Sequence, residues 1–179
     1  MTHPADATAR PNDALPQDVL LGIGNFTVHF HWQKDRFCHD VAFGDQPLLQ
    51  SVEGTGEDVW PDSAPLQQVS VESIGERCVA LGVGASGTSH FSVSVEPESC
   101  TDDACTIRFE WACRSKEAPA DPRSTYQWPA EHRSLIDIAA EPSTRQDTDG
   151  TSVCLRPTSE SGPTYVWAYR VTVRRPVGE

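Results

Sequence analysis

Residues 26–43 read FTVHFHWQ-KD-RFCHDVAF, and this stretch decides the fold. Side chains alternate between the two faces of a β-strand, and every second residue from Phe26 to Trp32 is apolar. The run from Phe37 to Phe43 repeats this alternation, with one polar exception. Lys34-Asp35 joins the two runs as a two-residue loop, which is typical of a β-hairpin. The stretch therefore predicts an antiparallel hairpin with one apolar face.

The other face of this hairpin gathers side chains that can bind a metal ion or transfer protons. The predicted pairing places His31 opposite Cys38 and His29 opposite Asp40. Zinc, iron, copper and nickel all accept ligands of these types. His29, His31, Cys38 and Asp40 are therefore candidate ligands for a divalent transition metal as cofactor. The pattern favours the plainer interpretation that they are the solvated face of a one-sided sheet. His39 lies on the apolar face and is expected to be a hydrogen-bonded core histidine.

Strand-like runs recur along the rest of the chain. Gly, Pro, Asp and Ser clusters separate them, as in antiparallel sandwiches and barrels. Only Pro129–Ala140 has the features of a helix, and it fits a strand about as well. We predict one all-β domain over residues 19–176, an antiparallel β-sandwich, with a closed or partly open β-barrel as the alternative. Residues 1–18 are polar and Pro-rich and are expected to form a disordered tail. The predicted strands are 25–33, 36–43, 47–53, 66–73, 77–83, 89–96, 106–114, 123–128, 134–140, 151–156 and 164–174.

Charge and hydropathy exclude several classes of partner. The chain of 179 residues carries a net charge of −12, which argues against nucleic acid and against anionic membrane surfaces. No apolar run reaches the length of about 20 residues that a membrane-spanning helix needs. The N-terminus has no apolar stretch of the signal-peptide type, so a cytoplasmic location is expected.

The even number of cysteines, six, allows disulfides, but the lack of an export signal and the adequate core size favour reduced thiols. Cys100 and Cys105 are the closest pair in sequence. The other four lie in strand-like runs and are expected to be small buried hydrophobic residues, namely Cys38, Cys78, Cys113 and Cys154.

Residues 82–87 match the Gly-x-Gly-x-x-Gly pattern of dinucleotide-binding proteins. That chemistry requires a helix directly after the glycines, so that the pyrophosphate meets the helix N-terminus. The residues that follow, 89–95, alternate as a strand instead. We therefore predict a glycine-containing turn between two strands and no nucleotide site.

Two Trp-Pro pairs lie in predicted loops, at Trp60 and at Trp128. A loop tryptophan can stack on the face of a sugar while nearby polar groups bind hydroxyls. Trp60, Trp128, Tyr126 and Asp58 are therefore candidate ligand-binding residues. We favour the interpretation that each indole covers an open end of the sandwich, where its large apolar surface is best buried.

The function expected from these observations is a soluble, non-catalytic binding or interaction module for a small molecule, a glycan or a protein. A metal-dependent enzyme that uses the His-x-His hairpin is the first alternative. The second alternative is a structural subunit that pairs through an exposed sheet edge, such as residues 164–174.

Overall fold

The computed structural model describes residues 15–54, 60–116, 121–159 and 162–176. These residues form strands and one short 3-10 helix, η1 (Ala130–Leu135). The first seven strands are β1 (Val19–Ile23), β2 (Phe26–Gln33), β3 (Arg36–Phe43), β4 (Gln46–Ser51), β5 (Gln68–Ile74), β6 (Arg77–Ser86) and β7 (Ser89–Cys100). The others are β8 (Ala104–Arg114), β9 (Ser124–Gln127), β10 (Ile136–Ala140), β11 (Thr144–Asp149), β12 (Ser152–Pro157) and β13 (Thr164–Arg174).

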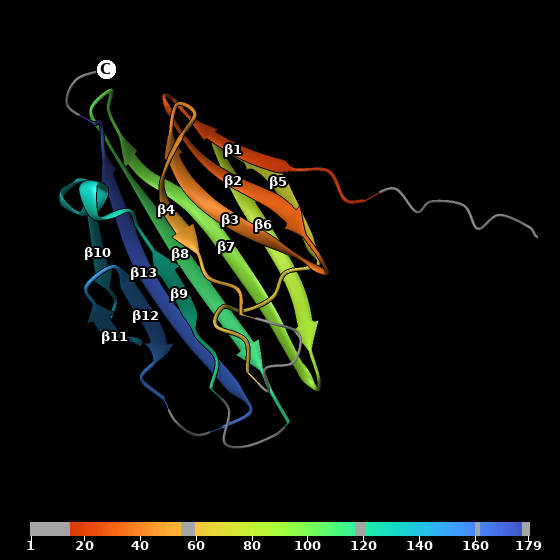
Figure 1. Cartoon of the computed structure of the whole chain (residues 1–179). Coiled ribbons are helices and arrows are strands. Elements are labelled where there is room, and N and C mark those ends of the chain that lie inside the picture. Colours follow the sequence, from red (N-terminus) through yellow and green to blue (C-terminus); the bar gives the residue numbers. More distant parts are fainter. Residues whose placement is uncertain (1–14, 55–59, 117–120, 160–161, 177–179) are drawn as a thin grey trace, which may run out of the picture.

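The strands form two antiparallel sheets that pack face to face (Figure 1). The seven-stranded sheet has the order β1-β2-β3-β4-β9-β12-β11, and the six-stranded sheet has the order β10-β13-β8-β7-β6-β5. Each sheet ends in two edge strands, so the fold is the predicted β-sandwich and not the closed barrel. Within the described residues, no helix is long and apolar enough to cross a membrane.

The predicted hairpin is confirmed in its register. Strands β2 and β3 pair antiparallel, with Gln33 opposite Arg36 and His29 opposite Asp40. The two-residue loop closes because Lys34 adopts a positive φ of 61°. The apolar side chains of both strands point into the core, where Phe26, Val28 and Phe30 are at most 1% exposed.

Two strands were missing from the prediction, and one ambiguous segment is divided. β11 was not predicted because all its residues are polar and five of the six are exposed, so it shows no apolar alternation. β1 is short and contains Gly22. The segment 129–140 contains both elements in succession, first η1 and then β10. Of the predicted tail, residues 1–14 lie outside the described residues, and 15–18 have no regular secondary structure.

The strand predicted as an exposed edge lies inside a sheet instead. Residues 164–174 form β13, which is hydrogen-bonded to β10 on one side and to β8 on the other. Its inward residues, including Trp167 and Val171, are fully buried. The prediction that subunits pair through residues 164–174 is therefore wrong, because this strand has no free edge. The edge strands of the described sheets are β1, β11, β10 and β5.

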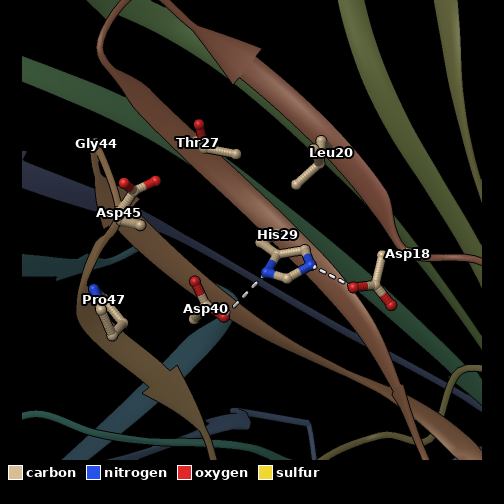
Figure 2. A pocket seen from close by; sticks show the side chains of 9 residues that line it. Asp18, Leu20, Thr27, His29, Asp40, Gly44, Asp45 and Pro47 are labelled. Carbon is tan, nitrogen blue, oxygen red and sulfur yellow. Dashed lines mark hydrogen bonds and ion pairs between the residues drawn. The ribbon is translucent and has the colours of Figure 1, made fainter.

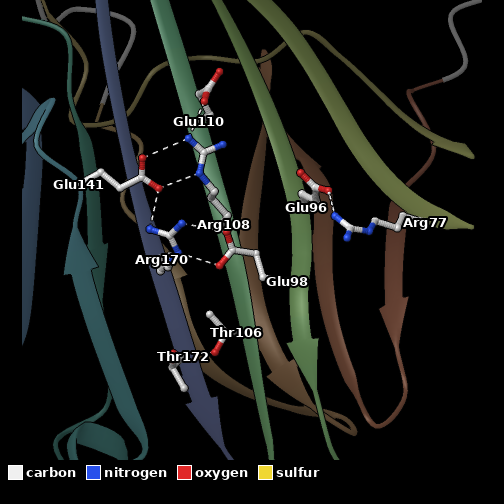
Figure 3. A network of polar contacts seen from close by, with 9 residues as sticks. All are labelled: Arg77, Glu96, Glu98, Thr106, Arg108, Glu110, Glu141, Arg170 and Thr172. Carbon is white, nitrogen blue, oxygen red and sulfur yellow. Dashed lines mark hydrogen bonds and ion pairs between the residues drawn. The ribbon is translucent and has the colours of Figure 1, made fainter. Parts of the chain in front are cut away.

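The outer face of the six-stranded sheet carries a network of ion pairs (Figure 3). Arg108 on β8 contacts both Glu110 and Glu141, and Arg170 on the adjacent β13 contacts Glu98 and Glu141. Most of these groups are partly exposed, so their contribution to stability is small for each pair. The network marks this face as the solvated side of β7, β8 and β13.

The cysteines differ in part from the prediction. Cys100 and Cys105 form a disulfide between the ends of β7 and β8, which corrects the expectation of six reduced thiols. Cys38 and Cys113 are buried, as predicted, whereas Cys78 is exposed on β6 and Cys154 is intermediate.

A buried chain of polar aromatic groups connects the two sheets through the core. His39 on β3 lies with its Nε2 2.8 Å from the hydroxyl of Tyr126 on β9. That hydroxyl lies 2.6 Å from the hydroxyl of Tyr169, which also accepts a hydrogen bond from Trp111 Nε1 at 3.0 Å. Burial lowers the pKa of His39 to about 3, so its imidazole is uncharged at neutral pH. The prediction of a hydrogen-bonded core histidine is confirmed.

The glycine-containing turn is shorter than predicted. The β6–β7 hairpin turns at residues 87–88, whereas Gly82 and Gly84 lie within β6, where they have a packing role. A Cβ atom on Gly84 would lie 2.1 Å from the carbonyl oxygen of Pro65 and 2.9 Å from Leu66 Cα. One on Gly82 would lie 2.8 Å from Val93 Cγ1. Because Gly84 has no side chain, the backbone of residues 65–66 can lie directly against β6, and Gly82 leaves room for the side chains of Val93 and Leu66.

We expect Tyr126→Phe to destabilise the fold by about 1–3 kcal/mol, because it removes the hydroxyl that bridges His39 and Tyr169 and leaves buried polar groups unpaired. Urea-induced unfolding at neutral pH measures this. Tyr165→Phe is the matched control, because Tyr165 is similarly buried but does not belong to this chain of hydrogen bonds. Equal, small effects of both substitutions would contradict the role assigned to the network.

We expect Gly84→Ala to destabilise the protein by about 2–3 kcal/mol, because the methyl group meets backbone atoms that cannot rotate away. Gly22→Ala is the control: a Cβ atom there meets nothing within 4 Å. The difference in unfolding free energy between the two variants is the quantity to measure. A Gly84→Ala protein as stable as the Gly22→Ala protein would show that residues 65–67 are not fixed against β6.

Candidate metal-binding site

Three of the four predicted metal ligands meet on the outer face of the seven-stranded sheet. His29 and His31 project from the same face of β2, and Asp40 comes from β3 opposite His29. Asp40 Oδ2 lies 3.7 Å from His29 Nδ1 and 3.5 Å from His31 Nδ1. One potential ligand atom from each residue lies within 4.8 Å of the other two.

These separations suit one small metal ion. Ligand atoms placed about 2.0–2.1 Å from a tetrahedral ion stand roughly 3.4 Å apart. The two histidine–carboxylate distances exceed that value by only a few tenths of an ångström. The three ligand atoms lie within 4.8 Å of one another, so side-chain rotation has to bring the two imidazoles closer together before all three can hold one ion.

Cys38, the fourth predicted ligand, does not join this group. It stands opposite His31 in the register, but its thiol donates a hydrogen bond to Gln33 Oε1 at 2.9 Å. Burial is the main cause that raises the pKa of the Cys38 thiol to about 12. The side chains close enough together to share one ion are therefore His29, His31 and Asp40, and the Cys38 thiol points away from them toward Gln33.

Asp18 is a member of the site that sequence reasoning missed. It directly precedes β1, and its Oδ2 lies 2.9 Å from His29 Nε2 (Figure 2). His29 is therefore held between two carboxylates, with Asp18 at Nε2 and Asp40 on the side of Nδ1. Asp18 lies within the predicted tail, and only the pairing of β1 with β2 brings it to His29.

The residues around His29 line an open pocket of about 480 Å³. Three carboxylates, from Asp18, Asp40 and Asp45, share it with the apolar side chains of Leu20 and Pro47. Burial raises the pKa of Asp40, and the neighbouring imidazoles partly oppose that shift. The hydrogen bond to His29 lowers the pKa of Asp18. The pocket is therefore acidic and suits a cation.

The residues predicted to bind a ligand in the two Trp-Pro loops are mostly buried. Tyr126 is completely buried and belongs to the core network, so it cannot contact a ligand, and its assignment is corrected. Trp128 is 5% exposed and Arg133 lies over its ring, with the guanidinium 4.9 Å from the ring centroid. Trp60 is half-buried against the core. Asp58 lies outside the described residues. This arrangement favours the alternative that Trp128 covers an end of the sandwich.

No protein-family model, curated protein or solved structure matches this chain.

Sequence reasoning also missed a buried carboxylate, Glu53, just after β4. Its side chain accepts a hydrogen bond from the Ser51 hydroxyl at Oε1, while Oε2 has no hydrogen-bond partner among the described residues. Burial raises the pKa of Glu53 to about 7, although the charge of Arg36 opposes the shift. Its position in a loop rich in Gly and acidic residues offers no sequence signal of burial.

Stability should depend on pH through Glu53. The pKa of Glu53 is about 7 in the folded protein and 4.5 in an ordinary glutamate. The protonated carboxyl group therefore contributes fully to the free energy of unfolding below pH 4.5, and this contribution is lost as pH rises through about 7. Glu53→Gln removes this loss. Between about pH 5 and about pH 8.5, the variant should gain about 2–3 kcal/mol relative to the parent protein in urea-induced unfolding.

The exposed Glu72 provides the control, since Glu72→Gln removes the same charge without affecting a buried group. Its unfolding free energy should follow that of the parent protein across the same pH range. Parallel profiles for the Glu53→Gln and parent proteins would mean that Glu53 is not a buried, proton-binding carboxyl group.

Proposed function

We propose that the protein is a non-catalytic binding module that holds a divalent transition-metal ion on the outer face of its seven-stranded sheet. The observation that carries this proposal is the convergence of three ligand atoms, from His29, His31 and Asp40, within 4.8 Å of one another. Two neighbouring strands fix their backbone positions, so little ordering is needed when an ion binds.

The donor set supports a zinc-type ion. Two imidazole nitrogens and one carboxylate oxygen suit zinc, and they also suit iron, nickel or copper. Magnesium and calcium instead prefer sites built from oxygen ligands. The acidic pocket around the set adds favourable charge for any cation.

Exposure favours binding over catalysis. The side chains of His29 and His31 are 33% and 38% exposed, so an ion bound there would remain open to solvent. A metal-dependent enzyme, the rival function, would use the same ligands and an open coordination position. Such enzymes gain much of their electrostatic stabilisation from sites that exclude water, and these imidazoles lie on an open surface.

Asp18 supports the proposal as a positioning residue. A carboxylate that accepts the Nε2–H hydrogen bond of His29 fixes the tautomer in which Nδ1 is unprotonated, on the side that faces Asp40. Histidines that bind metal ions in proteins usually have a second partner of this kind.

Zinc should bind the chelator-treated protein at one equivalent, and His29→Ala/His31→Ala should abolish that binding. Isothermal titration calorimetry measures the stoichiometry and affinity. Zinc at about 100 times its Kd should also stabilise the parent protein by about 2.7 kcal/mol, which thermal unfolding detects. His90→Ala is the control, since this exposed histidine lies on β7 in the other sheet. Equal zinc binding by the double variant would refute the site.

Asp18→Asn should weaken zinc binding roughly 10- to 100-fold, because the amide no longer fixes the tautomer of His29 as a carboxylate does. Asp45→Asn removes the same charge from the same pocket, at a residue outside the three-ligand set. It should weaken binding less than Asp18→Asn. The same loss in both variants would mean that Asp18 acts only through the charge of the pocket.

A further inference from the structure

The six-stranded sheet ends in an edge strand, β5, whose outer side has no partner strand among the described residues. This strand spans Gln68–Ile74 and is hydrogen-bonded to β6 on its other side (Figure 1). It is the longest of the four edge strands, and six of its seven residues are exposed. An edge strand of this kind presents unpaired N–H and C=O groups to which another strand can bind.

The geometry of the β5–β6 hairpin identifies which backbone groups face the open edge. Its loop has two residues, so the flanking residues Ile74 and Arg77 form a hydrogen-bonded pair. Hydrogen-bonded and non-hydrogen-bonded pairs alternate along an antiparallel ladder. The N–H and C=O groups of Val69, Val71 and Ser73 therefore point away from β6, toward the open edge.

The residue before β5 covers the margin of the sheet, whereas β5 itself is left open. The side-chain amide of Gln67 accepts a hydrogen bond from the backbone N–H of Ala85 at 2.7 Å and donates one to the carbonyl oxygen of Ala85 at 3.3 Å. Gln67 thus takes the place of a strand residue beside the end of β6. No side chain among the described residues covers the outer backbone groups of β5 in this way, so the open edge begins at Gln68.

The side chains of β5 give little protection against pairing with another strand. Edge strands are commonly protected by several charges, by proline or by a bulge. β5 keeps a regular register with β6, contains no proline and has one charged residue, Glu72. Val71 and Ile74 are apolar and are 37% and 59% exposed. The six residues of the edge strand β11, by contrast, include three charged ones.

The sequence of β5 is complementary to a second copy of itself. When two copies run antiparallel with Val71 at the centre, Val69 of each copy lies opposite Ser73 of the other. The open N–H and C=O groups of all three residues then form hydrogen bonds across the edge. Val71 lies opposite the same residue of the second copy, which covers its exposed apolar surface. Glu72 lies opposite Ser70, so the carboxylates of the two copies are not directly opposed.

We propose that two copies of this chain pair through β5 in this register, so that their six-stranded sheets form one continuous antiparallel sheet. Both strands are already ordered within their own sheets, so pairing costs less conformational entropy than the binding of a free peptide. One pair of strands buries less surface than a standard interface, so the dimer is weak, with a Kd of about 10–100 µM. The interface lies in the sheet that does not carry His29, so it is independent of the proposed metal site.

Sedimentation velocity of the full chain from about 5 to about 500 µM should show a monomer converting to a dimer as concentration rises. Because each copy carries a net charge of −12, the dimer should be tighter at high than at low sodium chloride concentration. Amide hydrogen exchange should slow at Val69, Val71 and Ser73 as the dimer forms. A dimer in which these amides exchange at the monomer rate overturns the proposal. A protein that stays monomeric also overturns it and leaves the edge to a strand of another protein.

Val71→Glu should weaken the dimer at least about tenfold, because it places two like charges directly opposite each other at the centre of the interface. Val83→Glu is the matched control: Val83 is 50% exposed on β6, next to the edge strand, and receives the same charge. Val71→Pro removes an N–H group that faces the open edge and keeps the bonds to β6, so it should also abolish the dimer. Circular dichroism checks that each variant is folded. Equal weakening by Val71→Glu and Val83→Glu would place the contact on the outer face of the sheet and refute pairing through β5.

Discussion

The chain of hydrogen bonds from His39 through Tyr126 and Tyr169 to Trp111 is the constraint on which the rest of the structure depends. It crosses the core from the seven-stranded sheet to the six-stranded one, and its members come from four different strands. A polar group in an apolar core is costly unless every partner is in place. These hydrogen bonds form only when the four side chains meet, so the network favours the observed alignment of the two sheets.

This constraint extends to the proposed metal site through strand β3. His39 and Asp40 are consecutive residues, so the inward hydrogen bond of His39 also fixes where Asp40 leaves the outer face. The paired strand β2 then carries His29 and His31 to the same point. A carboxylate and two imidazoles are thus held in position by a core that has no direct contact with the ion they would bind. The low pKa of His39 keeps the inner histidine uncharged, whereas the outer two remain accessible to solvent.

The proposed metal site lies where the regular packing of the sandwich ends. Its pocket lies where β1 and the turn before β4 leave the outer face of the hairpin open. Elsewhere the chain packs more closely: because Gly84 has no side chain, the backbone of residues 65–66 can lie directly against β6.

The sequence by itself determined the all-β sandwich, the register of the hairpin and the shared face of His29, His31 and Asp40, because alternation and a two-residue loop are local properties of the chain. The tertiary structure alone decided the rest. It placed Asp18 against His29, turned the Cys38 thiol toward Gln33, buried Tyr126 and Glu53, and brought Arg133 to Trp128. Most of these contacts depend on which strands become neighbours, and strands distant in the sequence leave no periodic signal of their pairing. Burial likewise depends on packing between the sheets, so composition predicted the kinds of side chain available and only the fold determined their partners.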